Sequence, residues 1–131
     1  MEELLASRST QQPIRIIVAE DNDDLRAVMP PLIDEVPALR CAGTTAYLEE
    51  IAPLIAEHRA QVAVLDIQLR GGSTLQRLPS LRAQFPATRF IIHSGHSNPE
   101  LMRSTGADAY VLKSGDFDEL IRVIQSLVMA S

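Results

Sequence analysis

A single carboxylate ends one of the most apolar segments of this sequence. The run VAVLD at residues 62–66 has four apolar residues and then Asp66, and Gly71 and Gly72 follow shortly after it. A buried carboxylate is costly unless a cation or several hydrogen-bond donors satisfy it. Asp66 therefore either reaches solvent at the end of its strand or belongs to a site.

Four further polar side chains stand in the same position relative to an apolar run. Glu20 and Asp21 follow IRIIVA, Ser94 follows FIIH, and Lys113 follows AYVL. Of the 12 basic residues, Lys113 is the only lysine and all the others are arginine. An ammonium is a compact point charge that a planar guanidinium does not simply replace, so this lysine has a chemical rationale.

Together these groups suit the binding of a divalent cation and a phosphoryl group. Three close carboxylates repel one another unless a cation lies between them. Hard oxygen ligands favour Mg²⁺, which usually takes few protein carboxylates and keeps positions open for water and phosphate oxygens. Ser94 can donate to one phosphoryl oxygen and Lys113 can pair with another, because a phosphoryl group needs neutralising from several sides.

Alternating short strands and helices must position these groups. The expected strands are residues 14–19, 39–44, 62–66, 89–93 and 108–112. The expected helices are residues 23–36 with a kink or break at Pro30-Pro31, 45–58, a segment from Gly72 to about Gln84, a short one capped by Asn98 and ended by Gly106, and a last one opened by Asp116. This order predicts a parallel sheet with helices on both faces, whose carboxyl edge holds the ligand site.

Composition limits the function classes. The chain has 131 residues, a net charge of −5 and 46% hydrophobic residues, as expected for one folded domain. No basic cluster is present, so nucleic-acid binding by this chain is not expected. No apolar run approaches the roughly 20 residues of a membrane span, and the N-terminus lacks the basic start of a signal peptide. With one cysteine, Cys41, a cytoplasmic protein is expected.

The segments IIVAED, VLDIQL, IIHSG and GADAYVLK make the sequence similar to a known family. It resembles the receiver domain of bacterial two-component response regulators, most closely the receivers that usually precede a helix-turn-helix DNA-binding domain. The resemblance implies a flavodoxin-like α/β fold with a five-stranded parallel sheet of order 2-1-3-4-5. The resemblance covers about residues 13–130, and residues 13–131 are expected to form the receiver domain. Residues 1–12 are polar and lack periodicity, so a flexible N-terminal arm is expected there.

The resemblance also implies roles for individual residues. Asp66 matches the phosphorylated aspartate. Glu20 and Asp21 match the acidic pair that holds Mg²⁺ together with Asp66. The other matches are Gln68, whose backbone carbonyl completes the metal shell; Ser94 and Lys113, which contact the phosphoryl group; Tyr110, the aromatic that turns inward with Ser94 on activation; and Gln68 with His96, which tune the lifetime of the phosphoryl group.

Three departures from the family pattern surround the site. Arg70 stands where members usually have proline, Thr74 lies where a glycine is expected, and Ser114 follows the lysine where many members have proline. None of the three removes a chemical group from the set described above.

Three functions follow from these observations. The first is a phosphorylation switch, in which Asp66 takes a phosphoryl group from a histidine kinase or histidine phosphotransfer protein and the face of the fourth helix, fifth strand and fifth helix changes. The second is a degenerate receiver that binds a partner without phosphorylation. The third is an aspartyl-phosphate phosphohydrolase, which Gln68 disfavours because such enzymes carry an acid there. An output domain, a downstream partner or a homodimer is compatible with the first two.

Simpler explanations exist for each residue taken alone. Acids after a strand often only begin a helix, a serine there is often a turn residue, and Tyr110 can be a core aromatic. A zinc site of His93, His96 and Cys41 lacks a fourth ligand and the usual spacing. Only the joint occurrence of the polar groups favours a site.

Overall fold

The structure is a computed structural model that describes residues 12–95, 98–113 and 116–129. Its elements, in chain order, are β1 (Ile14–Ala19), α2 (Asp23–Asp34), β2 (Leu39–Thr45), the 3₁₀ helix η1 (Leu48–Glu50), α3 (Ile51–His58), β3 (Val62–Leu65), β4 (Gln68–Leu69), β5 (Gly72–Ser73), α4 (Thr74–Gln84), β6 (Arg89–Ser94), α5 (Pro99–Ser104), β7 (Ala109–Leu112) and α6 (Phe117–Met129). The predicted arm, residues 1–12, lies almost wholly outside the described residues. Within the described part, no helix has the length and apolar character needed to cross a bilayer.

Five parallel strands form the central sheet, in the order β2-β1-β3-β6-β7. Since β6 and β7 are its fourth and fifth strands along the chain, the predicted order 2-1-3-4-5 is confirmed. The strands are short and rich in β-branched residues because both of their faces are covered.

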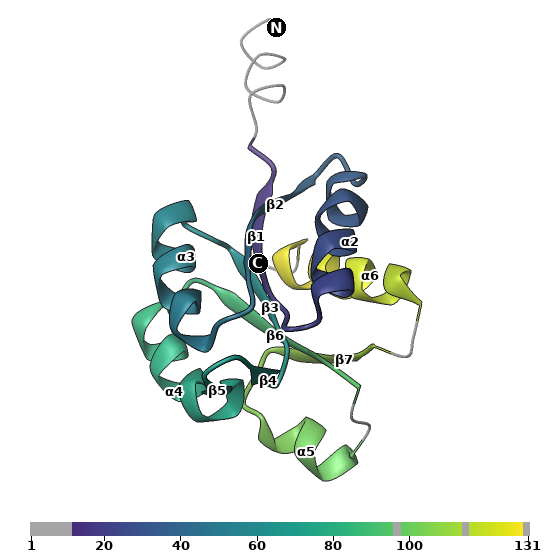
Figure 1. The fold of residues 1–131 in the computed structure, drawn as a ribbon. Coiled ribbons are helices and arrows are strands. Elements are labelled where there is room, and N and C mark those ends of the chain that lie inside the picture. Colours follow the sequence, from purple (N-terminus) through teal and green to yellow (C-terminus); the bar gives the residue numbers. More distant parts are fainter. Residues whose placement is uncertain (1–11, 96–97, 114–115, 130–131) are drawn as a thin grey trace, which may run out of the picture.

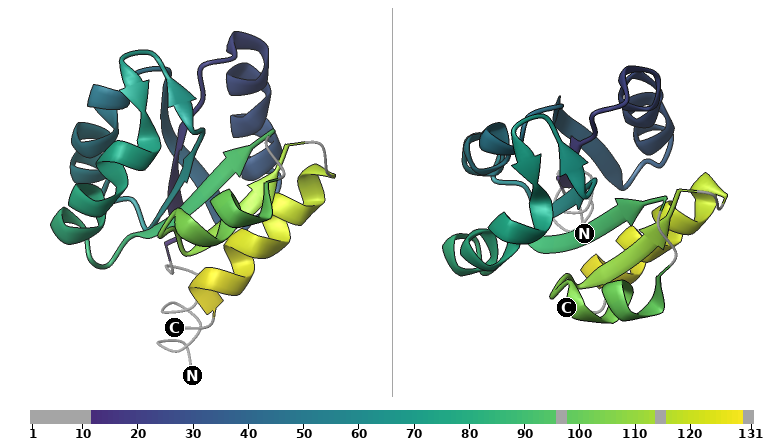
Figure 2. Two further views of the ribbon diagram at one scale, coloured as in Figure 1. Left: turned by 90° about the horizontal axis from the view of Figure 1, so that it is seen from below. Right: turned by 60° about the horizontal axis from the view of Figure 1, so that its bottom comes forward.

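Helices cover both faces of this sheet (Figures 1 and 2), as predicted. One buried cluster joins alternate residues of the strands to α2 and α6, through Met29, Ile33, Leu120 and Ile124. The other joins the opposite strand faces to α3 and α4, and Leu101 of α5 packs against it. The period-2 alternation of the strands therefore divides the core into two layers.

Helix α2 passes through Pro30 and Pro31 without interruption. Of the predicted kink or break at these prolines, the break is therefore wrong, and the helix ends at Asp34 rather than Val36. Each proline lacks the N–H that would donate within the helix. The helix persists because Met29 and Ile33 are fully buried against the sheet, which offsets the lost hydrogen bonds.

The second predicted helix begins later than expected. Thr45 is the last residue of β2 and pairs with Ala19, and α3 begins only at Ile51 after the 3₁₀ turn of η1. The hydroxyl of Thr45 donates to Glu50, and it also accepts from the backbone N–H of Tyr47 at 3.0 Å. Backbone pairing and these local bonds replace the helix that the sequence pattern favoured.

A small antiparallel hairpin of β4 and β5 follows Asp66 and was not predicted. Gln68 pairs with Ser73 and Leu69 pairs with Gly72. Gly71 and Gly72 have φ values of 102° and 144°, a region that side chains with a Cβ rarely adopt. The two glycines therefore turn the chain sharply at the mouth of the carboxyl edge.

The other predicted elements are confirmed within one or two residues. β6 extends to Ser94, β7 begins at Ala109, and α4 ends at Gln84. Asn98 caps α5 by accepting from the N–H groups of Glu100 and Leu101 at 2.9 and 3.1 Å.

Candidate functional site at the carboxyl edge of the sheet

Backbone hydrogen bonds continue past the ends of the strands and align the candidate residues. The N–H of Glu20 donates to Thr45 O, that of Asp66 to Ala19 O, and that of Lys113 to Ser94 O, at 2.9, 2.9 and 2.8 Å. Each residue after a strand is thus held by the neighbouring strand. The side chains converge because the carboxyl ends of parallel strands share one edge.

Asp66 is buried, and each of its carboxylate oxygens has a donor. Oδ1 accepts from the N–H of Ile67 at 2.8 Å, and Oδ2 lies 3.1 Å from Nζ of Lys113. The backbone carbonyl of Asp66 accepts from the hydroxyl of Thr74, which is fully buried. The strand end is therefore fixed on its backbone and on both sides of its carboxylate.

Lys113 joins two buried acids. Its Nζ lies 2.8 Å from Oε1 of Glu20 as well as 3.1 Å from Oδ2 of Asp66. The second oxygen of Glu20 accepts from the N–H of Asn22 at 3.0 Å. The ammonium is thus a cation shared by two carboxylates, which is why this pair of acids tolerates burial.

The electrostatics of the site are strongly perturbed. Burial raises the pKa of Asp66 to about 7, and the charge of Glu20 adds to that effect, while the bond from Lys113 opposes it. Burial disfavours the Lys113 ammonium, but its bonds to Glu20 and Asp66 outweigh that effect and raise the pKa of the lysine. A carboxyl group with a pKa near neutrality is typical of functional sites.

Three acids at this edge could hold a metal ion. Glu20, Asp21 and Asp66 each offer an oxygen, and these oxygens lie within 4.8 Å of one another. Glu20 and Asp66 are buried, whereas Asp21 is exposed. With Lys113 counted, the group carries a net charge of about −2 when all are ionised, which a divalent cation would neutralise. The all-oxygen donor set fits Mg²⁺.

The remaining predicted residues lie around this centre or beyond the described part of the chain. Ser94 is buried as the last residue of β6. Tyr110, half-buried on β7, packs against the core layer of α3, α4 and α5. Gln68 is exposed on β4. His96 and Ser114 lie outside the described residues.

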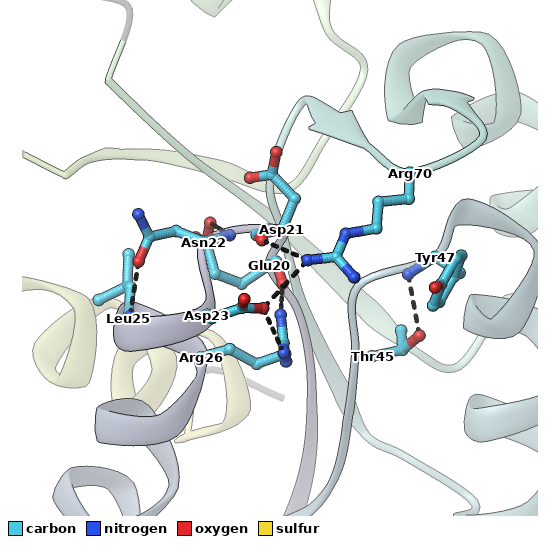
Figure 3. A network of polar contacts seen from close by, with 9 residues as sticks. All are labelled: Glu20, Asp21, Asn22, Asp23, Leu25, Arg26, Thr45, Tyr47 and Arg70. Atoms are coloured by element: carbon cyan, nitrogen blue, oxygen red, sulfur yellow. Dashed lines mark hydrogen bonds and ion pairs between the residues drawn. The ribbon is translucent and has the colours of Figure 1, made fainter.

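A second set of polar contacts forms a rim beside this acidic group (Figure 3). The guanidinium of Arg70 reaches from the β4–β5 turn to the loop between β1 and α2, where its Nη2 lies 3.0 Å from Oδ1 of Asp23 and 3.5 Å from the carbonyl oxygen of Asp21. Its Cζ also lies 5.6 Å from the centroid of the Tyr47 ring. Arg26 contacts the same Asp23 oxygen at 2.7 Å.

The contacts that Thr74 and Arg70 make around the site have no signal in the sequence. In the sequence, Thr74 is only a departure from the family pattern, yet its hydroxyl and its N–H, which donates to Ile67 O at 2.8 Å, close the turn after Asp66. In the sequence, Arg70 is only a replacement for the usual proline. The spacing from the strand end places both near the site, but it does not give their partners.

The structure gives no support to a zinc site within the described residues. Glu20, Asp21 and Asp66 are the only potential metal-binding group found there. His93 is buried on β6, and burial, followed by the charge of Lys113, lowers its pKa to about 4. Cys41 is a free, half-buried thiol on β2 whose pKa burial raises to about 11.

The fold and this pocket define a doubly wound α/β domain with an acidic, lysine-bridged site at its carboxyl edge. The sequence matches the response regulator receiver domain family over residues 16–125, and the chain belongs to that family. The predicted resemblance is confirmed. Receiver domains are signalling proteins of two-component systems, and the family binds Mg²⁺ in an acidic pocket.

The relatives are response regulators. The chain is 25% identical over 117 residues to the DNA-binding transcriptional activator DevR/DosR of Mycobacterium tuberculosis, covering 87% of this chain and 54% of that protein. It is 25% identical over 119 residues to the nitrate/nitrite response regulator NarL of Escherichia coli, covering 88% and 55%. The chain therefore spans about half the length of these relatives.

A solved structure of similar sequence has the same fold. A DNA-binding response regulator of the LuxR family from Staphylococcus aureus is 29% identical, with a TM-score of 0.78 over 86% of this chain and 97% of that one. This similarity agrees with the overall fold described above.

Proposed function

We propose that the chain is a phosphorylation switch and that Asp66 accepts the phosphoryl group. The observation that carries this proposal is the position of Lys113, whose ammonium bridges Glu20 and Asp66 at 2.8 and 3.1 Å in an acidic pocket. A cation so placed favours the ionised carboxylate against the effect of burial, and it can then pair with the charge of a phosphoryl group.

In the transfer step, a carboxylate oxygen of Asp66 forms a bond to phosphorus. The bond from phosphorus to the leaving atom of the donor breaks, and its electron pair stays with the leaving group. The product is an acyl phosphate on Asp66. The hydroxyl of Ser94 donates a hydrogen bond to one phosphoryl oxygen, and the ammonium of Lys113 forms an ion pair with another.

The same residues would hold the divalent ion. Glu20, Asp21 and Asp66 supply carboxylate oxygens, and the backbone carbonyl of Gln68 supplies a further ligand. When bound, Mg²⁺ neutralises charge on the phosphoryl oxygens. The close approach of the three acid oxygens, within 4.8 Å, supports this assignment.

The phosphoryl group changes the balance between two conformations of the domain. Ser94 and Tyr110 turn inward, which remodels the surface of α5, β7 and α6 by population shift. Tyr110 is half-buried on β7 and packs against the core layer of α3 and α4, so an inward turn of its ring would change its exposure. Gln68 and His96 tune how long the phosphoryl group persists.

The proposed donor is a histidine kinase or a histidine phosphotransfer protein, and the proposed recipients are a downstream protein or an output domain. DevR/DosR and NarL are about twice as long as the segment that matches this chain, and DevR/DosR and the Staphylococcus aureus regulator are described as DNA-binding. The surface that changes on phosphorylation would then contact the recipient or a second receiver.

Intact-mass measurement after incubation with acetyl phosphate and Mg²⁺ tests the proposal. We expect one added phosphoryl group in the wild type and in Asp24→Asn, an exposed acid of α2 that serves as the matched control. We expect none in Asp66→Asn or in the presence of a chelator. A folded wild type that gains no phosphoryl group would favour the receiver that binds a partner without phosphorylation.

A further inference from the structure

Arg70 stands at the junction of three loops around the acidic pocket (Figure 3). Its backbone N–H donates to Ala46 O, and its carbonyl accepts from the N–H of Leu48, both at 2.9 Å. These bonds fix residue 70 beside the loop after β2 whatever its side chain does. The side chain then extends to the loop after β1, which carries two of the three clustered acids.

The ion pair of Arg70 with Asp23 is easily exchanged. The side chains are 45% and 70% exposed, and an exposed pair contributes little net stability. Arg26 contacts the same Asp23 oxygen at 2.7 Å, closer than Arg70 at 3.0 Å. Asp23 therefore keeps a cationic partner when Arg70 leaves it.

Without a bound divalent ion, the acidic side chains at this edge of the sheet are unfavourable for an anionic donor. Glu20, Asp21 and Asp66 cluster there, and Asp23 and Asp24 are exposed at the start of α2. Lys113, the cation inside the pocket, is already paired with two carboxylates. A guanidinium at the rim can attract a phosphoryl donor and bind two of its oxygens at once.

We propose that Arg70 is a donor-binding residue, which exchanges Asp23 for the phosphoryl group of the incoming phosphodonor. The cation–π contact of the guanidinium with Tyr47, with 5.6 Å between Cζ and the ring centroid, helps to hold it at the rim during the exchange. This inference rests on the proposed phosphorylation of Asp66, because the bound donor is the one that Asp66 attacks.

The first test compares phosphorylation rates over a range of acetyl phosphate concentrations at saturating Mg²⁺. We expect Arg70→Gln to raise the half-saturating donor concentration by about three- to tenfold, with a smaller change in the maximal rate. Arg70→Lys keeps the charge but loses the planar guanidinium, so its half-saturating donor concentration should lie between those of the wild type and Arg70→Gln. Arg40→Gln, an exposed arginine at the opposite end of β2, controls for net charge and should leave the rate unchanged.

The Asp23 variant separates donor binding from simple loop bracing. If Arg70 binds the donor, Asp23→Asn frees the guanidinium and lowers the half-saturating concentration, and this gain disappears in the double variant with Arg70→Gln. If the pair only braces the loops, Asp23→Asn and Arg70→Gln both raise that concentration or both leave it unchanged. Either of these results would overturn the proposal.

A measurement without phosphoryl transfer distinguishes failure of this inference from failure of the proposed function. Asp66→Asn protein is titrated with inorganic phosphate and Mg²⁺ while the arginine Nε–Hε resonances are recorded by NMR, and Arg70→Gln identifies the signal of residue 70. A saturable shift of that signal is expected, and its absence rejects the rim site. If the resonance of residue 70 shifts in Asp66→Asn but the wild-type protein gains no phosphoryl group in the intact-mass experiment, the phosphorylation switch is rejected and the anion site at Arg70 is retained.

Discussion

Asp66 and His93 respond to burial in opposite directions. Burial raises the pKa of Asp66 to about 7 and lowers that of His93 to about 4. Between about pH 4 and pH 7, the folded chain keeps a proton on Asp66 that the unfolded chain has released. The contribution of Asp66 to the free energy of unfolding therefore becomes more unfavourable as pH rises through this range. As pH falls from 6.5 to about 4, the unfolded chain takes up a proton that buried His93 refuses, which also lowers the stability.

Replacing Asp66 by asparagine should therefore stabilise the fold at neutral pH in the presence of a chelator. The amide keeps the shape of the side chain and removes the buried charge that the fold tolerates poorly. We expect the free energy of unfolding to rise by on the order of 2 kcal/mol at pH 8, and the gain to vanish near pH 4. Denaturant unfolding at several pH values measures it.

The exposed acid Asp24 provides the control for this comparison. Asp24→Asn should change the unfolding free energy by less than about 0.5 kcal/mol at every pH, since it removes a solvated charge. An Asp66→Asn variant that is less stable than the wild type at pH 8 would contradict the electrostatic description of the pocket.

The effect of His93 on stability should depend on pH in the opposite direction from that of Asp66, since it grows as pH falls. Nδ1 of His93 is buried and has no hydrogen-bond partner among the described residues. His93→Leu should remove the acid-dependent loss between pH 6.5 and about 4, on the order of 2 kcal/mol, because no imidazole remains to be protonated on unfolding. Parallel stability curves for wild type and variant over this range would show that His93 titrates normally in the folded chain.

Helix α2 carries a local conflict between its sequence and its packing. Pro31 is exposed in the interior of the helix and lacks the N–H that would donate to Ala27 O. Pro31→Ala should stabilise the protein by about 1–2 kcal/mol, because the gain in helix propensity exceeds the entropy that the unfolded chain recovers.

Thermal unfolding of Pro31→Ala beside Pro37→Ala measures this gain. Pro37 is also exposed but lies after the end of α2, so its replacement restores no helical hydrogen bond. The Tm should rise only for Pro31→Ala. Equal shifts in the two variants would mean that α2 does not need the missing bond.

The sheet and the centre of the pocket could be predicted because both depend on local patterns. Apolar runs of four to six residues identify the strands, and the polar residue after each run falls at the carboxyl edge by topology alone. Asp66, Glu20 and Lys113 meet there for that reason.

The hairpin and the rim could not be predicted. Strands of two residues, such as β4 and β5, are too short to show any periodicity. The partner of Arg70 is a side chain 47 residues earlier in the sequence, and only the folded chain brings them together. Likewise, the burial of Met29 and Ile33 that holds α2 together depends on the sheet, which helix propensity ignores.

The site is formed by loops that follow separate strands of the sheet. An ion that binds there therefore stabilises the folded domain as a whole, because the unfolded chain does not hold these loops together. Mg²⁺ that binds only the folded chain should raise the free energy of unfolding by roughly 1–3 kcal/mol at ten to a hundred times its dissociation constant. Thermal unfolding with Mg²⁺ and with chelator measures this. Compared with the wild type, the Mg²⁺-dependent increase should be smaller in Glu20→Gln and equal in Arg40→Gln. Equal increases in all three proteins would place the ion elsewhere.

The position of the acyl phosphate decides whether Asp66 is the acceptor. Borohydride reduces an aspartyl phosphate to homoserine, and peptide mass spectrometry then locates the converted residue. Cleavage after Arg59 and Arg70 releases AQVAVLDIQLR, in which Asp66 is the only acidic side chain. After treatment with acetyl phosphate and Mg²⁺, we expect homoserine in this peptide and in no other. Homoserine in a different peptide, or none in a folded and treated protein, would contradict the phosphorylation switch.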